Sequence, residues 1–370
     1  MCDSGTIPDS IATFRYCKIP DEDDRSGSVI DFTCSTIRPL DYEALSQAAL
    51  HKPITIPIEW EGAKILASTE AINSEELYNI KASPLQTRFT ASAIGLVRGG
   101  WLPSWLGALH RRTVIVLDRN IVSKICGRFR RGEAVQQEED FLDLFAGQAV
   151  RINPMLFAME GNARGLPTPT LAYAQLLEAA KKLKAALPAA EIMASAESLR
   201  GMLGLIDDYR AGFARKSRFL MQIAPSLAAP VSRKLMQARW AEVLAAASEC
   251  GVPLGSFVVL ASLSTIAVPN GQSPAKTLLN LKPSYSAGNA YNALADLLAL
   301  EMLVHVFALF PQAPIQLCTA DKDLALFWTG MRASNFKIIG GSASCTLAPV
   351  EQLFPGWTLD ECLSSMKKST

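Results

Sequence analysis

The sequence RRTVIVLDRN, residues 111–120, places five apolar or β-branched residues between a pair of arginines and an aspartate. A short apolar run rich in Val and Ile predicts a β-strand that is buried on both faces. The strand ends at Asp118, and open α/β sheets hold their active sites at the carboxyl ends of their strands. An aspartate after a strand also commonly caps a helix or forms a turn, so Asp118 has both a structural and a functional interpretation.

The overall composition is that of a folded protein with a sizeable core. Hydrophobic residues make up 49% of the 370 residues, charged residues make up 19%, and the net charge is +1. This length fits two domains, or one domain with a large insertion. A nearly neutral chain does not attract nucleic acid as a whole, so any basic binding surface has to be local.

Cysteine usage and the apolar segments indicate a cytoplasmic location. The eight cysteines are widely spread, contain no CxxC pair and show no zinc-binding spacing. The first ten residues, MCDSGTIPDS, lack the basic and apolar regions of a signal peptide. The apolar run at residues 257–268 is too short to span a bilayer. We therefore expect a soluble cytoplasmic protein with reduced thiols and no membrane association.

Residues 1–110 contain no chemical motif that we recognise and are predicted to form a separate N-terminal α+β region. Asp41 is expected to cap a short helix at residues 42–50. Alternating apolar residues around a central Glu-Gly pair predict a β-hairpin at residues 54–68. Another short helix is expected at residues 74–80. The sequence leaves the role of this region open.

Two predicted helices each carry a carboxylate among apolar residues. Glu160 closes a short helix that starts at an Asn-Pro pair, and Asp296 lies in the apolar body of a helix at residues 288–310. Asn292 is four residues before Asp296 and therefore shares its helix face. A buried carboxylate needs a partner or a bound cation. The structural alternative for Glu160 is exposure, or an ion pair with Arg164.

A second apolar strand, PIQLC at residues 314–318, also leads into acids. Asp321 and Asp323 follow it, just as Asp118 follows the first strand. Four or five carboxylates gathered at one edge of a sheet would repel one another strongly. Divalent cations would neutralise such a cluster, and hard oxygen ligands suit Mg²⁺ or Mn²⁺. The sequence therefore predicts a metal site that could activate water and stabilise a phosphoryl transfer.

Positive charge is concentrated locally. Residues 169–250 have a helical pattern, and residues 210–239 contain seven Lys or Arg and no acid. Such a surface could bind phosphate groups, or could be a solvated helix face paired with acids elsewhere. Arginines in the last turn of the helix expected at residues 121–131 could equally complement its dipole. The candidates for contact with nucleic acid are Arg128, Arg130, Arg131, Arg215, Lys216 and Arg218.

The acidic motifs, in this order, resemble those of the PIN-domain nucleases. In that family a first strand ends in Asp, commonly followed by x-Asn, as in LDRN with Asp118 and Asn120. A Glu ends an early helix, as in NPMLFAMEGN with Glu160, and another acid lies in a later helix, as in NAYNALADLLAL with Asp296. The last motif is T-x-D-x-D after a strand, which CTADKDL matches.

The resemblance covers residues 113–168 and 251–341 and implies an α/β fold, with an open, mostly parallel α/β/α sheet. The helical stretch between the two parts is far longer than a small PIN domain needs, and Arg119 beside the first acid is another departure. The implied domains are residues 1–110 as the N-terminal region, 111–168 with 251–345 as the nuclease domain, 169–250 as a helical insertion and 346–370 as a tail.

The same resemblance implies roles for individual residues. Mg²⁺ or Mn²⁺ would be held mainly by Asp118, Asp296 and Asp321, while Glu160 completes the site or positions a water. Asp323 would hold a second ion. The residues expected to orient the ligands are Asn120, Asn292 and Thr319.

The implied function is metal-dependent hydrolysis of phosphodiester bonds, by an endoribonuclease of the toxin or defence-effector type. Nucleic acid is the expected partner, RNA before DNA, and residues 1–110 or the helical insertion could bind a protein partner. Oligomeric state is left open. The alternative is a catalytically weak nucleic-acid-binding or assembly module. A haloacid-dehalogenase-type phosphatase is disfavoured, because Asn120 stands where that class has its second Asp.

Overall fold

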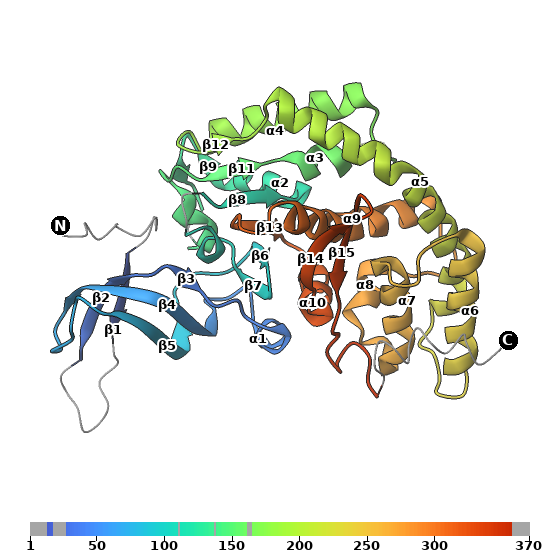
Figure 1. The fold of residues 1–370 in the computed structure, drawn as a ribbon, viewed down its shortest axis with the longest axis horizontal. Helices are drawn as coiled ribbons and strands as arrows, with labels where there is room; N and C mark the ends of the chain where they lie inside the picture. Colours follow the sequence, from blue (N-terminus) through green and yellow to red (C-terminus); the bar gives the residue numbers. More distant parts are fainter. Residues whose placement is uncertain (1–12, 18–26, 110–111, 137, 161–164, 357–370) are drawn as a thin grey trace.

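A computed structural model describes residues 13–17, 27–109, 112–136, 138–160 and 165–356 (Figure 1). An antiparallel sheet lies at one end of the molecule and the helices α6–α8 at the other, with a central sheet between them. The helices are α1 (Tyr42–Gln47), α2 (Arg119–Arg128), α3 (Met155–Glu160), α4 (Pro169–Ala186), α5 (Ala196–Leu227), α6 (Met236–Cys250), α7 (Phe257–Ala267), α8 (Pro274–Leu279), α9 (Ala287–Leu309) and α10 (Lys322–Met331). Shorter 3-10 turns are η1 (Leu106–Ala108), η2 (Phe141–Phe145) and η3 (Pro269–Gly271).

The central sheet contains both parallel and antiparallel strands. Its order is β12 (Glu191–Ile192), β11 (Arg151–Asn153), β8 (Val114–Leu117), β13 (Ile315–Thr319), β6 (Ile94–Val97) and β7 (Gly100–Pro103). The first four strands run parallel to one another, whereas β6 pairs antiparallel with β13 and β7 antiparallel with β6. The apolar strand expected at residues 113–117 is thus β8, and its residues Ile115, Val116 and Leu117 are buried.

The N-terminal sheet is antiparallel and curled. It consists of β1 (Phe14–Cys17), β2 (Val29–Thr33), β4 (Thr55–Ser68), β3 (Thr36–Ile37) and β5 (Leu77–Gln86), which pairs with β4. The hairpin predicted at residues 54–68 is wrong, because β4 continues through Gly62. That residue has φ +60° at a shift in the β4–β5 register, so it forms a bulge and not a turn. The helix predicted at residues 74–80 is also wrong, because Ile80 belongs to strand β5 and pairs with Trp60 of β4.

The predicted fold class, an open and mostly parallel α/β/α sheet of the PIN type, is therefore wrong. The described chain combines helices with four sheets, three of them wholly antiparallel, and the largest sheet is itself mixed. The strands β6 and β7 come from residues 94–103, so the expected boundary at residue 110 falls within the part of the chain that builds the central sheet. The expected insertion at residues 169–250 supplies the edge strand β12 as well as α4, α5 and α6.

Several local predictions are confirmed. Asp41 caps α1 and accepts a hydrogen bond from the Ala44 amide at 3.0 Å. Helix α3 ends at Glu160 and α9 covers the long apolar stretch, as expected. A hairpin of β14 (Ser334–Ile339) and β15 (Ser342–Thr346) follows α10. A second small hairpin joins β9 (Phe129–Arg130) to β10 (Glu133–Ala134).

Helix α9 is the core helix of the C-terminal half. It contacts α5, α7, α8 and α10, the strand β13 and the β14–β15 hairpin. Among the described helices it alone is long and apolar enough to cross a membrane, and 56% of its most apolar window is buried inside the protein. Such burial is that of a helix packed within a folded core.

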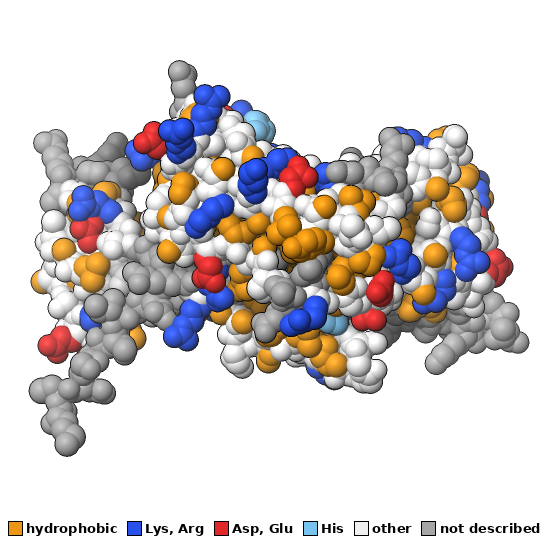
Figure 2. Space-filling view, turned by 90° about the horizontal axis from the view of Figure 1, so that it is seen from above, with side chains coloured by type: hydrophobic (Ala, Val, Ile, Leu, Met, Phe, Trp, Pro, Cys, Tyr) orange, Lys and Arg blue, Asp and Glu red, His pale blue; other side chains and the backbone are white. Residues whose placement is uncertain are grey.

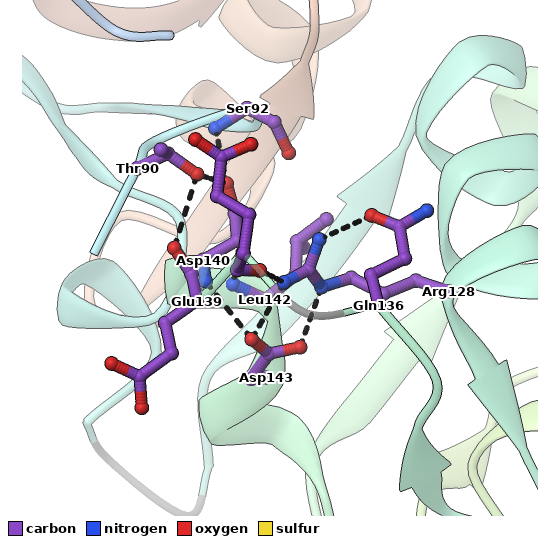
Figure 3. A network of polar contacts seen from close by, with 9 residues as sticks. Thr90, Ser92, Arg128, Gln136, Glu139, Asp140, Leu142 and Asp143 are labelled. Atoms are coloured by element: carbon purple, nitrogen blue, oxygen red, sulfur yellow. Dashed lines mark hydrogen bonds and ion pairs between the residues drawn. The ribbon is translucent and has the colours of Figure 1, made fainter. Parts of the chain in front are cut away.

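A buried polar network connects residues 90–92 to α2 (Figure 3). The guanidinium of Arg128 pairs with the Asp143 carboxylate at 2.5 Å and also donates to Gln136 and the Glu138 carbonyl. Asp140, which is fully buried, accepts hydrogen bonds from the Thr90 hydroxyl and from the backbone amides of Ser92 and Leu142, at 2.6 to 2.9 Å. The network fixes the N-terminal region against α2.

Removal of one partner should show how much this network stabilises the fold. Asp143→Ala leaves Arg128 buried without its carboxylate, which should lower the free energy of unfolding by about 3 kcal/mol. Asp207→Ala is the matched control, because Asp207 is exposed and lies 3.8 Å from Arg210 in a solvated pair. Urea denaturation followed by tryptophan fluorescence measures both. Equal stability of the two variants would contradict the assigned role of the network.

Candidate active site

The parallel pairing of β8 with β13 brings two of the predicted acids to one edge of the central sheet. Leu117 and Cys318 are opposite each other in the register, and the Asp118 amide donates to the Cys318 carbonyl at 3.1 Å. Asp118 and Asp321 therefore leave neighbouring strands in the same direction. The sequence expectation that both strands deliver an acid at their carboxyl ends agrees with this geometry.

Both aspartates cap the helix that follows them. Asp118 Oδ1 accepts from the Ile121 amide at 2.7 Å, and Asp321 Oδ1 accepts from the Asp323 and Leu324 amides at 2.8 and 3.0 Å. These bonds hold one carboxylate oxygen and fix the direction of the other, Oδ2. The helix-cap interpretation of Asp118 is thus true, and its carboxylate also accepts hydrogen bonds from Thr319 and Ala320.

Thr319 connects the two aspartates. It is fully buried, its Oγ1 accepts from the Asp321 amide at 3.0 Å, and its hydroxyl forms a hydrogen bond with the Asp118 carboxylate. A hydroxyl can donate one hydrogen bond and accept others, so Thr319 fits between a carboxylate and an amide. This arrangement is the one expected of a residue that orients ligands without touching the metal.

Glu160 and Asp296 reach the same place from α3 and α9. Together with Asp118 they line a cavity of about 30 Å³ whose remaining wall is largely apolar, including Met159 and Leu324. A volume of this size holds a water or a single cation and is too small for a nucleotide. All three acids are half-buried. We call Asp118, Glu160, Asp296 and Asp321 the acid cluster.

The pKa values show that these carboxylates sense one another. Burial raises the pKa of Asp296 well above its ordinary value, and the charges of Asp321, Glu160 and Asp118 raise it further. Burial is also the main cause of the raised pKa of Asp118 and of Glu160. For Asp118 the hydrogen bonds from Ile121, Thr319 and Ala320 act in the opposite direction. The acid cluster thus holds negative charge that its hydrogen bonds offset only in part.

Arg119 supplies the nearby positive charge. Its guanidinium stacks on the Phe157 ring, 4.5 Å from the ring centroid, and lowers the pKa of Glu160 against the effect of burial. From the sequence alone, this arginine is notable only as a departure from the PIN-domain pattern. Its position on the first turn of α2, directly after Asp118, places it beside the acid cluster.

Tyr291 is a site residue that the sequence did not reveal. It lines the cavity, only 5% of its surface is exposed, and its hydroxyl has no hydrogen-bond partner among the described residues. Burial and the charge of Glu160 raise its pKa to about 12, so the hydroxyl keeps its proton at neutral pH. Buried Tyr hydroxyls normally find a partner, so the unpaired hydroxyl of a cavity-lining tyrosine is a candidate contact for a ligand. From the sequence alone, a tyrosine in an apolar helix cannot be distinguished from an ordinary core residue.

The other predicted ligands and orienting residues are less central. Asp323 is half-buried, and its carboxylate bonds to Thr277, away from the cavity-lining residues. Asn120 and Asn292 are exposed, and neither lines the cavity.

The donors suit a hard divalent cation in chemistry, although they are not gathered in coordinating positions. Carboxylate oxygens and a hydroxyl are the ligands that Mg²⁺ and Mn²⁺ prefer. Within the described residues, no group of three His, Cys, Asp or Glu side chains is close enough to hold one ion. Binding would therefore require rotamer changes of the acids, which their attraction to the cation would have to drive against their mutual repulsion.

The basic residues proposed for nucleic-acid contact do not form one surface at this site. Arg128 is used in the interior network, and Lys216 forms a half-buried ion pair with Glu301 at 2.5 Å. Arg215 and Lys216 line a separate cavity of about 730 Å³ between α5, α9 and the β14–β15 hairpin. On the face seen in Figure 2, Lys and Arg side chains are interspersed with acidic and apolar ones. The predicted residues that remain exposed are Arg130, Arg131, Arg215 and Arg218.

Comparisons with known proteins found no match: no family model fits this chain, and no curated protein and no solved structure is similar to it.

The charge of the acid cluster should make the protein less stable as the pH rises. Because the pKa of Asp296 is raised on folding, the folded state binds more protons, and its stability falls as pH rises through that pKa. Asp296→Asn removes this charge, so in EDTA at pH 7.5 the variant should unfold at a higher temperature than the wild type. The difference should shrink as pH falls toward 3.8, the ordinary Asp value. Asp207→Asn is the exposed control, and a difference independent of pH would contradict the assignment.

Proposed function

We propose that this protein hydrolyses phosphodiester bonds in a reaction that depends on Mg²⁺ or Mn²⁺, with the acid cluster as its active site. The observation that carries the proposal is the meeting of Asp118, Glu160 and Asp296, from three separate elements, at one small and largely apolar cavity. Buried carboxylates that raise one another's pKa destabilise a fold, so they are expected where a ligand neutralises them.

RNA is the proposed substrate, because the acidic motifs resemble those of the PIN-domain nucleases in type and order. A cytoplasmic location is part of this proposal. The described cysteines are free thiols, as expected in a reducing compartment.

The chain's own residues have distinct roles in this proposal. Asp118, Asp296 and Asp321 would hold the cation, and Glu160, whose pKa the Arg119 charge lowers, would position the attacking water and accept its proton. Thr319 keeps Asp118 and Asp321 in place. A bound divalent cation lowers the pKa of water and offsets negative charge on the phosphate during attack. The apolar wall of the cavity excludes bulk water, which strengthens each of these interactions.

Tyr291 is proposed to donate its hydroxyl proton in a hydrogen bond to the water that the small cavity can hold. A neutral donor that keeps its proton at neutral pH positions this water without adding charge to the site.

Asp118→Asn should lower the rate of RNA cleavage at least about 100-fold, because the amide preserves the cap to Ile121 but binds a cation poorly. A time course with labelled RNA and Mn²⁺, repeated in EDTA, measures this. Asp41→Asn is a matched control, because Asp41 caps α1 in the same way and lies outside the cavity. Full activity of Asp118→Asn would refute the proposed function, provided that both variants unfold cooperatively.

Tyr291→Phe should reduce kcat about 100-fold and leave KM and Mn²⁺ affinity nearly unchanged, because only a hydrogen-bond donor that positions the attacking water is lost. Tyr285→Phe is the control, since Tyr285 is also a partly buried tyrosine, but its hydroxyl bonds to the Leu279 carbonyl at 2.8 Å. Steady-state kinetics on a labelled oligonucleotide separate the two constants. An unchanged kcat would remove Tyr291 from the reaction.

One observation favours a second function, a nucleic-acid-binding or assembly module with little catalysis. Among the described residues, no three potential ligands are arranged around one point, whereas an efficient metal site is usually preorganised. This candidate predicts that calorimetry detects no Mn²⁺ binding to the wild type. Binding that is lost in Asp296→Asn would exclude it.

A further inference from the structure

A second, much larger cavity lies beside the acid cluster. Its volume is about 680 Å³, and it is lined by residues 48–51 and 90–94 of the N-terminal region, by α2, by the segment leading to η2 and by the start of α10. Cavities of this size hold a ligand as large as a nucleotide. We call it the lysine cleft, after Lys124 and Lys322 in its wall.

The two lysines keep their positive charge available. Lys124 Nζ donates to the Ser92 carbonyl at 3.0 Å, and Lys322 Nζ donates to the carbonyls of Ser46 and Ala48 at 3.1 and 2.9 Å. A carbonyl is a neutral acceptor, so these bonds position the ammonium groups without neutralising them. A phosphate that approaches would form charge-assisted hydrogen bonds with both.

The other charges of the wall are mostly satisfied within the protein. Arg128 is paired with Asp143, and the buried Asp140 accepts three hydrogen bonds, as Figure 3 shows. Glu138 is exposed, and its negative charge opposes the two lysines. Among the charged side chains of the wall, Lys124 and Lys322 are thus the two cations held by neutral carbonyls, and Glu138 and Asp140 carry the opposing negative charge.

The lysine cleft and the acid cluster share two elements. Helix α2 starts after Asp118 and carries Lys124, while Lys322 directly follows Asp321 at the start of α10. At this edge Asp118 lines the small cavity, and the helices that follow β8 and β13 each place one lysine in the wall of the lysine cleft. A nucleic-acid strand that crosses this edge would contact both the lysine cleft and the acid cluster.

We propose that the lysine cleft binds the backbone phosphates of a single-stranded RNA whose neighbouring phosphodiester lies at the acid cluster. The position of the cleaved bond rests on the proposed function, whereas the binding of RNA by the lysine cleft does not. It gives the N-terminal region a role, because the carbonyls of Ser46, Ala48 and Ser92 hold the lysine side chains in the wall. A strand is favoured over a free phosphate ion, because the lysine cleft is wide and its two cations come from different helices.

Salt dependence of RNA binding tests the proposal. Fluorescence anisotropy with a labelled oligouridylate, in EDTA to prevent cleavage, gives the slope of log Kobs against log[KCl]. Each phosphate contact to a single strand contributes about 0.7 to this slope, so Lys124→Gln with Lys322→Gln should make it shallower by about 1.4. Each single substitution should account for about half. Lys81→Gln is the control, because Lys81 is exposed on β5, outside the lysine cleft.

Further variants separate charge from folding. Lys124→Arg with Lys322→Arg keeps both charges, so its slope should stay near that of the wild type, and thermal unfolding checks that all variants are folded. Equal slopes for the Gln variants and the wild type would overturn the proposal. It would also be overturned if inorganic phosphate bound in a lysine-dependent way while RNA binding did not depend on the lysines.

The outcomes distinguish this inference from the proposed function. A wild type that cleaves no RNA with Mn²⁺ but shows a lysine-dependent slope would retain the lysine cleft and refute the hydrolysis. Cleavage that Asp118→Asn abolishes, together with equal slopes for the lysine variants, would retain the hydrolysis and refute the lysine cleft.

Discussion

The candidate site depends on the parallel pairing of β8 with β13. Residues 117 and 318 are opposite each other, and the Asp118 amide bonds to the Cys318 carbonyl across the pair. Parallel strands end at the same edge, so two segments some 200 positions apart in the sequence deliver Asp118 and Asp321 side by side. A shift of one residue in this register would turn alternate side chains to the other face of the sheet and separate the acids from α3 and α9.

The helix caps resolve a conflict between stability and charge. An uncapped, buried aspartate would be expensive in free energy, and a fully bonded one would have no oxygen left for a ligand. Asp321 gives one oxygen to two amides of the helix that follows it, whereas Asp118 bonds to the Ile121 amide and also to Thr319 and Ala320. Asp296 has no comparable position, because it lies in the middle of α9, and its pKa is raised most clearly. The least compensated acid is therefore the one most dependent on a cation.

The sequence predicts the features of this structure that depend on neighbouring residues better than those that depend on contacts between distant segments. Local signals succeed: the Asp41 cap, the end of α3 at Glu160 and the buried strand β8 are each determined by a few neighbouring residues. The topology is not predicted, because β6 and β7 look like isolated short segments in the sequence. The central sheet is mixed only because β6 pairs with β13 and β7 pairs with β6. The prediction of a hairpin in place of the continuous strand β4 is wrong for a related reason. Gly62 permits a turn and a bulge equally, and β5 selects the bulge.

Site residues divide in the same way. The acids are detectable because a carboxylate among apolar residues is unusual in any context, whereas a tyrosine or a lysine is unremarkable until its surroundings are known. Tyr291 becomes significant through its unpaired hydroxyl, and Arg128 loses its proposed surface role through Asp143.

The contacts of Lys322 extend this reasoning to the N-terminal region. Its ammonium group bonds to carbonyls at residues 46 and 48, while the residue before it belongs to the acid cluster. Any displacement of α1 would therefore release a charge directly beside Asp321, where it could pair with the carboxylate and compete with a cation. The N-terminal region thus keeps positive and negative charges apart at the sheet edge, although it supplies none of the acids. That separation is a physical reason for a region without chemical motifs to be packed against the candidate site.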